Sequence, residues 1–325
     1  MSAGIVTVFS TKPLPLFMNG GAISLPKAMP LDADIMLEPL KIARSRWPTL
    51  VSGAISVLLL AGLGRELFRG GLDGLVLAFP ASPVFYLAFI AIYAVQPVSD
   101  FVIFRRLWGM TTAGIVPILR KLVANDVLLG YSGEAYLYAW ARGRLNMVAT
   151  PFAAIKDVSI LSAVVGNVFT LLLLALATPL AYTLIPPALV GPVGGSAAVI
   201  LGTSLIILLF RGRLFSLPTI DLRWVFSVHI VRTLVYVGLQ ALSWHLALPD
   251  VPLGIWMLLV TSRQLVARLP LVPNKDIVFA NLAVLLVGGN SSISQLIALT
   301  VALTLLCHII VFAATWLPSL NRKQA

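Results

Sequence analysis

The chain has 325 residues, of which 59% are hydrophobic and only 11% charged, and its mean hydropathy is +0.99. A soluble enzyme of this size needs a more polar surface, so this class of protein is excluded. The 23 Lys and Arg residues outnumber the 12 Asp and Glu residues, which gives a net charge of +11. In so apolar a chain, this excess indicates cytoplasmic loops of a membrane protein rather than binding to nucleic acid.

The first 46 residues contain five prolines and no sustained helical period. We expect them to form a mobile cytoplasmic arm, and the missing basic start and long apolar run count against a signal peptide. Six later apolar stretches are long enough for a helix to cross the hydrocarbon core, which is about 30 Å thick. These stretches are residues 48–64, 75–96, 158–185, 193–210, 224–248 and 293–317.

Two shorter apolar pieces, residues 253–269 and 277–288, flank a segment that contains Pro270 and Pro273. Each is short for a membrane crossing, so the pair either crosses with a tilt or forms a re-entrant hairpin. The expected fold is all-α: a polytopic integral membrane protein with six to eight transmembrane helices. Residues 47–318 would form one transmembrane domain and residues 319–325 a short cytoplasmic tail.

The basic residues predict the orientation, because short cytoplasmic loops collect Lys and Arg. Twenty of the 23 fall in five segments that alternate with the predicted spans: 1–46, 97–157, 211–223, 263–275 and the C-terminal tail. Both termini are then cytoplasmic, and a bacterial inner membrane is the expected location. The single cysteine, Cys307, rules out a disulfide framework and a thiolate metal cluster.

Apolar sequence is interrupted by polar residues in two segments, about 101–155 and 253–288. Broken or re-entrant helices are tolerated at membrane depth where they line a cavity or are buried in protein. One such segment in each half of the chain is typical of an internally repeated transporter, and an inverted repeat would place the site between the halves.

In the first segment, a helix that starts near Ser132 would place Glu134, Tyr138 and Arg142 on one face. Two interpretations of Glu134 are open. A carboxylate in the first turn stabilises a helix, with Ser132 as its N-cap. Alternatively, an acidic residue at membrane depth pairs with a basic residue, acts in gating or binds a lipid head group.

In the second segment, Arg263, Arg268 and Lys275 lie around the proline break. Basic side chains near helix ends often extend to the membrane interface and need no other role. The functional alternative is a cationic pocket for a lipid phosphate, since guanidinium binds phosphate in a bidentate manner. Together, the head-group or gating candidates are Glu134, Tyr138, Arg142, Arg263, Arg268 and Lys275.

A polar stripe runs along the predicted span 224–248. Its spacing of three and four residues keeps it on one helix face, which must point to the bundle interior or to water. It lines a cavity or makes interhelical hydrogen bonds, and both interpretations are open. The members of this stripe are His229, Arg232, Tyr236 and Gln240. The remaining histidines, His245 and His308, are isolated in apolar sequence and are expected to be core or interfacial residues.

Motifs for enzymatic chemistry are missing from the sequence. It contains no metal-binding spacing of His or Asp, no glycine-rich phosphate loop and no serine elbow. We therefore expect no catalytic residues, no metal and no cofactor.

The Gly133-Glu134 pair at a helix start, Arg142 two turns later and the proline break ending at Pro273 resemble the transmembrane region of lysylphosphatidylglycerol synthase, the flippase-like integral membrane family. This resemblance implies a lipid translocator. The second family motif has two glycines and a glutamate where this chain has Asn274, Lys275 and Ala280, which counts against a mechanism that needs that glutamate. The aminoacyltransferase domain of the fused members has no counterpart here, so aminoacylation is not expected.

The leading hypothesis is a non-enzymatic protein that binds an anionic or modified envelope lipid, such as a phospholipid or glycolipid, and translocates it or assists in this. The rival is a membrane-embedded transferase, or an accessory subunit of one, that acts on a lipid-linked substrate with Glu134 or Asp126 as base. A homo-oligomer and a lipid-pathway enzyme partner are compatible with both. Nucleic acid is not an expected partner.

Overall fold

The computed structural model describes residues 79–127, 131–144, 150–184, 187–210, 214–269, 275–288 and 291–321. All of these residues belong to the unit Arg46–Ala325. Every regular element in them is helical, which confirms the predicted all-α class. The predicted arm, residues 1–46, the predicted span at 48–64 and the tail residues 322–325 lie outside the described residues.

Four of the described helices are long and apolar enough to cross a membrane. They are α3 (Pro83–Trp108), α6 (Thr150–Leu184), α9 (Thr219–Ala247) and α12 (Ser292–Asn321). Large apolar side chains on their outer faces are exposed, as contact with lipid requires. These helices are consistent with a multi-pass membrane protein. The part of the chain that the structure describes leaves the predicted count of six to eight crossings open.

The first of these helices corrects the predicted span at 75–96. α3 begins at Pro83 and continues through Pro97 to Trp108. The prediction ended the span at the polar residues that follow, but Ser99 and Asp100 are buried inside the protein rather than placed in a loop. Buried polar residues persist where partners are present, and Asp100 has two basic partners.

The other predicted spans agree more closely with the structure. α6 and α9 contain the spans predicted at 158–185 and 224–248 to within a residue, and α12 extends the one at 293–317 to Asn321. α7 (Pro187–Leu209) covers the span predicted at 193–210, but its apolar part, Val193–Ile207, is short. The predicted tail therefore begins inside α12.

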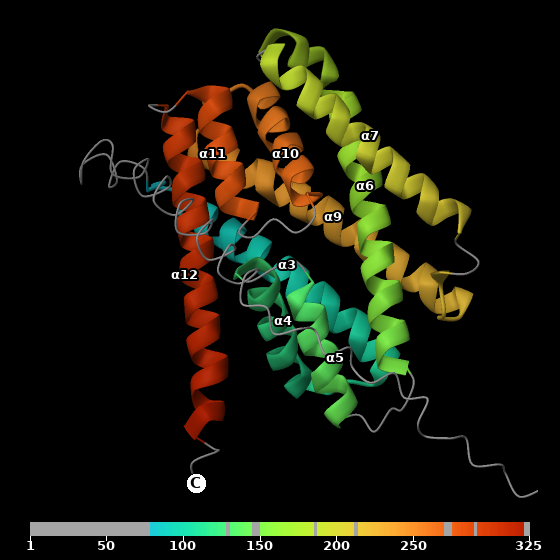
Figure 1. Ribbon diagram of the computed structural model, residues 1–325. Coiled ribbons are helices and arrows are strands. Elements are labelled where there is room, and N and C mark those ends of the chain that lie inside the picture. Colours follow the sequence, from blue (N-terminus) through green and yellow to red (C-terminus); the bar gives the residue numbers. More distant parts are fainter. Residues whose placement is uncertain are drawn as a thin grey trace, which may run out of the picture. The chain divides into compact units, whose positions relative to one another are not determined.

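Both interrupted segments form pairs of short helices (Figure 1). After α3 and the 3-10 turn η2 (Thr112–Gly114), α4 (Ile115–Val127) packs against α5 (Ser132–Arg144). In the second half, α10 (Leu253–Ala267) packs against α11 (Lys275–Val287). At about 1.5 Å per residue, each of these four helices is too short to cross a membrane on its own.

The start of α5 differs in detail from the prediction. The helix begins at Ser132, but Ser132 is not an N-cap, because its hydroxyl donates to the Ala124 carbonyl of α4 at 2.6 Å. Asn125 of α4 takes the capping role, since its Oδ1 accepts the Gly133 N–H at 2.7 Å. The two helices are therefore joined by polar contacts at the turn.

Two apolar clusters hold the helices together. One contains Trp244, Trp256 and Phe279 and joins α3, α9, α10, α11 and α12. The other contains Phe104 and Leu137 and joins α3, α4, α5, α6 and α9. Because α3 and α9 run through both clusters and pack along each other, their middle segments lie between the two.

Candidate functional site

A cavity of about 240 Å³ lies between the two apolar clusters. Side chains from α3, α4, α6, α9, α10, α11 and α12 line it, so both pairs of short helices contribute to one site. Residues from the middle of all four long described helices contribute to the lining of the cavity. They are Tyr93 on α3, Gly166 on α6, Tyr236 on α9 and Thr304 on α12.

The cavity wall carries more positive than negative charge. Four basic side chains, Arg232, Arg263, Arg268 and Lys275, face two acidic ones, Asp126 and Asp276. Placing a charged residue at the centre of a bilayer costs about 2.5–3.5 kcal/mol. Charge gathered in a cavity beside the middle of apolar helices therefore points to a ligand site.

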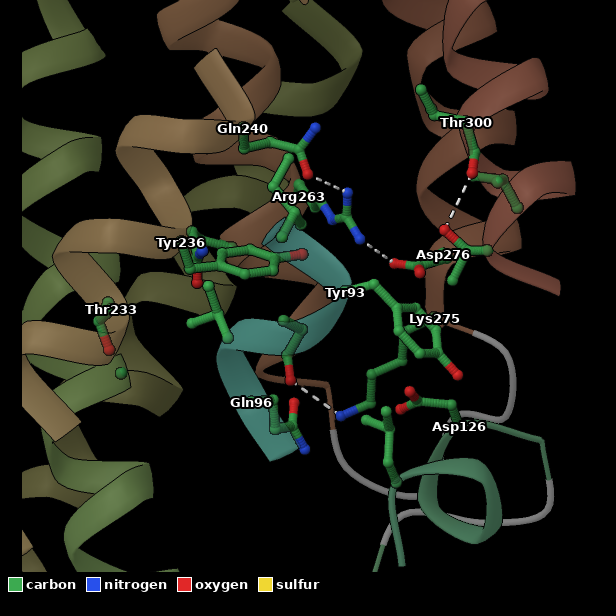
Figure 2. A pocket seen from close by; sticks show the side chains of 18 of the residues that line it. Tyr93, Gln96, Asp126, Thr233, Tyr236, Gln240, Arg263, Lys275, Asp276 and Thr300 are labelled. Carbon is green, nitrogen blue, oxygen red and sulfur yellow. Dashed lines mark hydrogen bonds and ion pairs between the residues drawn. The ribbon is translucent and has the colours of Figure 1, made fainter. Parts of the chain in front are cut away.

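Three of these four basic residues have defined partners. Arg263 donates to Gln240 Oε1 at 2.5 Å and to Asp276 Oδ1 at 2.7 Å, as Figure 2 shows, and its guanidinium lies over the Tyr236 ring. Arg232 donates to Ser162 Oγ at 2.7 Å. These contacts hold both guanidinium groups in place on the cavity wall.

Lys275 donates to the Ala267 carbonyl at 2.8 Å, and this uses one of its three N–H donors. Burial and the nearby Arg268 lower the pKa of Lys275, while Asp126 opposes the shift. Figure 2 shows Lys275, Tyr93 and Asp126 at the same side of the cavity.

Arg268 differs from the other three. No hydrogen bond or ion pair joins it to another described residue, and its Nε is buried. Its guanidinium packs against Gly166 of α6, where an added Cβ would lie 2.1 Å from Nη1. Burial and the neighbouring Arg232 lower the pKa of Arg268, so a negative charge beside it would relieve both costs.

A chain of alternating charges connects the cavity to the α4–α5 pair. Arg232 lies 3.5 Å from Asp100 Oδ1, and Asp100 Oδ2 accepts a hydrogen bond from Lys121 Nζ at 2.6 Å. Lys121 in turn lies 3.2 Å from Glu134 Oε1. Burial alone would lower the pKa of Lys121, but the two carboxylates outweigh it and raise the pKa. These buried ions compensate one another across four helices.

Tyr93, His308 and Asp126 form a row on the cavity wall. The Tyr93 hydroxyl lies 2.9 Å from His308 Nδ1, and His308 Nε2 lies 3.4 Å from Asp126 Oδ2. His308 is buried, whereas the Asp126 side chain is 48% exposed. From its apolar surroundings in the sequence, His308 is expected in the core or at the interface. Its partners lie on α3 and α4, more than 180 residues away in the chain, so no local pattern reveals the row.

The structure separates the predicted site residues into two groups. Arg263, Arg268, Lys275, Arg232, Tyr236 and Gln240 all line the cavity. The others lie outside it. Glu134 pairs with Lys121, Tyr138 packs edge-on against Phe152 with ring centroids 6.1 Å apart, and Arg142 is exposed.

His229 is fully buried on the same stripe, with its Nε2 3.1 Å from the Val158 carbonyl. The stripe thus faces the interior, where it both lines the cavity and makes interhelical hydrogen bonds. Of the two candidate bases, Asp126 lines the cavity and Glu134 does not.

Comparison of the chain with protein-family models, curated proteins and solved structures finds no match. The family resemblance stays an expectation from the sequence, and the cavity is the feature of the molecule that bears on function. Three arginines keep their positive charge at any physiological pH. A cavity with this wall is suited to an anion that can accept several N–H donors.

Proposed function

We propose that this chain is a multi-pass protein of the bacterial inner membrane, with both termini cytoplasmic, that binds an anionic lipid head group and translocates it or assists in this. The observation that carries the proposal is Arg268, which faces the cavity without a hydrogen bond or ion pair to another described residue. A lipid phosphate would supply the bidentate acceptor that a guanidinium favours.

The depth of the cavity supports a lipid as the source of the anion. Its lining comes from the middle of the four helices that, among the described residues, are long enough to cross a membrane. A head group that moves between leaflets must pass this depth, where fixed donors replace the water that it loses. The sequence resemblance to flippase-like proteins indicates the same function.

Liposomes that contain the purified full-length protein and a head-group-labelled fluorescent phosphatidylglycerol test translocation. A membrane-impermeant quencher reports how fast the inner-leaflet label reaches the outer leaflet. We expect faster exchange than in empty vesicles, and loss of the increase with Arg268→Gln. An exchange rate equal to that of empty vesicles would show that the chain alone does not translocate this lipid.

Arg142→Gln provides the matched control, because Arg142 is exposed and lies outside the cavity. Losing a hydrogen bond to a charged group costs about 1.5–3 kcal/mol. This corresponds to about 10- to 100-fold weaker lipid binding for Arg268→Gln. Arg142→Gln should bind as the unaltered protein does, and equal losses in both variants would contradict the assignment of the cavity as the binding site.

A further inference from the structure

Neutral polar side chains line the cavity beside the arginines. Tyr236 and Gln240 lie about one turn apart on α9, and Gln264 follows Arg263 on α10. Gln240 is 3% exposed and Gln264 is 5% exposed, so protein surrounds both side chains. Arg263 contacts both Tyr236 and Gln240, as Figure 2 shows. The part of the wall that α9 and α10 form therefore combines charge with neutral hydrogen-bonding groups.

The contact with Arg263 determines the orientation of the Gln240 amide. A guanidinium only donates hydrogen bonds, so the amide oxygen of Gln240 faces it, 2.5 Å from Nη1. The amide nitrogen keeps two N–H donors, and no hydrogen bond joins them to another described residue. A buried donor without a partner is unfavourable. Gln240 thus has a donor ready for a ligand in the cavity.

Gln264 and Tyr236 also have unused hydrogen-bonding groups. Within the described ranges, no hydrogen bond involves the side chain of Gln264 or the hydroxyl of Tyr236. Tyr236 meets Arg263 through the face of its ring, which leaves the hydroxyl available. An amide and a phenol can each donate and accept a hydrogen bond. These two residues can therefore bind a group of either kind.

Three threonines add hydrogen-bond acceptors to the cavity wall. The hydroxyls of Thr233, Thr300 and Thr304 donate to carbonyls of their own helices, at 2.8, 2.8 and 2.9 Å. Each hydroxyl has then used its only proton, so its oxygen can only accept from a ligand. A phosphodiester has no proton to donate. An anion alone would leave these acceptors without a partner.

A hydroxyl group matches a wall that offers donors and acceptors together, because it both donates and accepts. A phosphate only accepts and an ammonium group only donates, so neither uses the whole wall. The size of the cavity agrees with a larger ligand. At about 30 Å³ for each group the size of a water molecule, a volume of about 240 Å³ accommodates a phosphate together with the alcohol that it esterifies.

We propose that Tyr236, Gln240 and Gln264 form a hydroxyl-binding subsite, so that the cavity selects anionic lipids whose phosphate carries a polyol such as glycerol or a sugar. Arg268 binds the phosphate, and the subsite binds the hydroxyl groups of the attached alcohol. This inference rests on the proposed function and names the class of lipid that the site takes.

Two lipids that differ in these hydroxyl groups test the subsite. Phosphatidylglycerol and phosphatidylpropanol carry the same charge and a head group of nearly the same size, but the propanol lacks both hydroxyls. Binding of each, labelled on an acyl chain, is measured with the full-length protein in nanodiscs of phosphatidylcholine. We expect phosphatidylglycerol to bind about 10- to 100-fold more tightly, because the analogue leaves buried polar groups unpaired.

The ratio of the two affinities separates lost recognition from a general loss of structure. Gln264→Met removes the amide at similar size, and Tyr236→Phe removes the hydroxyl but keeps the ring against Arg263. Each should lower the ratio about three- to tenfold, and Tyr236→Phe decides the question if Gln264→Met does not fold. Gln295→Met and Tyr138→Phe are the matched controls, because both residues lie outside the cavity and their loss should preserve the ratio.

Competition with glycerophosphoglycerol distinguishes a lipid from a water-soluble phosphate ester. This compound is the head group of phosphatidylglycerol without the acyl chains. We expect it to compete on the order of 100-fold more weakly than the lipid, because it lacks their apolar surface. Equally strong competition would show that the site takes a soluble polyol phosphate, which contradicts a lipid as the ligand.

Two outcomes would overturn the hydroxyl-binding subsite. One is equal affinity for the two lipids, and the other is a ratio that stays unchanged in both Gln264→Met and Tyr236→Phe. In both cases anionic lipid still binds through Arg268, so the proposed function survives. Absence of binding of either lipid, with Arg268→Gln indistinguishable from the unaltered protein, would instead contradict the proposed function itself.

Discussion

At the scale of single residues, Gly166 makes room for Arg268. An added Cβ would lie 2.1 Å from Nη1 and 2.6 Å from Cζ of Arg268, and the guanidinium is the flexible end of its side chain. Gly166→Ala should therefore displace the guanidinium and leave the helices in place. Neither residue type nor spacing reveals this contact in the sequence, because it joins α6 to the end of α10.

We expect Gly166→Ala to weaken binding of phosphatidylglycerol about tenfold, because it moves a charged donor. The melting temperature in detergent should change little, since alanine is favoured over glycine within a helix by up to about 1 kcal/mol. Gly238→Ala is the control, because its Cβ would meet no atom within 4 Å. Unchanged affinity in Gly166→Ala would show that Arg268 does not hold the ligand.

The lowered pKa of Lys275 predicts that lipid binding depends on pH on the alkaline side. Burial and Arg268 lower its pKa, so the amine loses its charge at a lower pH than an exposed lysine, whose pKa is about 10.4. Anion binding should weaken as the pH rises through this lowered pKa. Lys275→Arg should remove the alkaline loss, because arginine stays charged. Lipid binding measured at increasing pH, in the unaltered protein and in Lys275→Arg, checks this. An equal loss of affinity at alkaline pH in the two proteins would count against it.

At the scale of elements, the α4–α5 pair depends on close backbone approach. A Cβ on Gly133 would lie 2.2 Å from the Lys121 carbonyl oxygen and 2.8 Å from Asn125 Oδ1. The Lys121 carbonyl belongs to the α4 backbone and cannot move aside as a side chain does. The glycine before Glu134 in the sequence motif is therefore explained by helix packing.

Gly133→Ala should separate the two helices and lower the free energy of unfolding by about 1–3 kcal/mol, the usual cost of overpacking. Gly143→Ala, on the same helix, should be neutral or slightly stabilising, because its Cβ meets nothing within 4 Å. Thermal unfolding of both variants in the same detergent compares them. Equal melting temperatures would contradict the tight contact.

The lengths of the apolar stretches in the sequence predicted the positions of five helices well: α6, α9, α10, α11 and α12. The prediction was wrong at α3, where the predicted span ended at residue 96 although the helix continues to Trp108. Asp100 is buried because Lys121 and Arg232, from two other helices, compensate its charge. Such tertiary compensation is invisible to a pattern that considers one segment at a time.

At the scale of the whole molecule, distant segments build the cavity. The sequence indicated most of the basic wall, because Arg263, Arg268 and the α9 stripe break the apolar pattern. It missed the row of Tyr93 and His308, whose residue types are ordinary in apolar helices and whose contact joins α3 to α12. The sequence pattern also grouped Glu134 with this site. In the structure Glu134 lies outside the cavity, and a series of ion pairs through Lys121 and Asp100 connects it to Arg232 on the cavity wall.

The most direct test of the central claim is native mass spectrometry of the protein purified with phosphatidylglycerol. We predict one tightly held lipid that survives in Arg142→Gln and is lost in Arg268→Gln at matched folding. Retention of the lipid by Arg268→Gln, or its equal loss from both variants, would contradict the claim that the cavity binds an anionic head group.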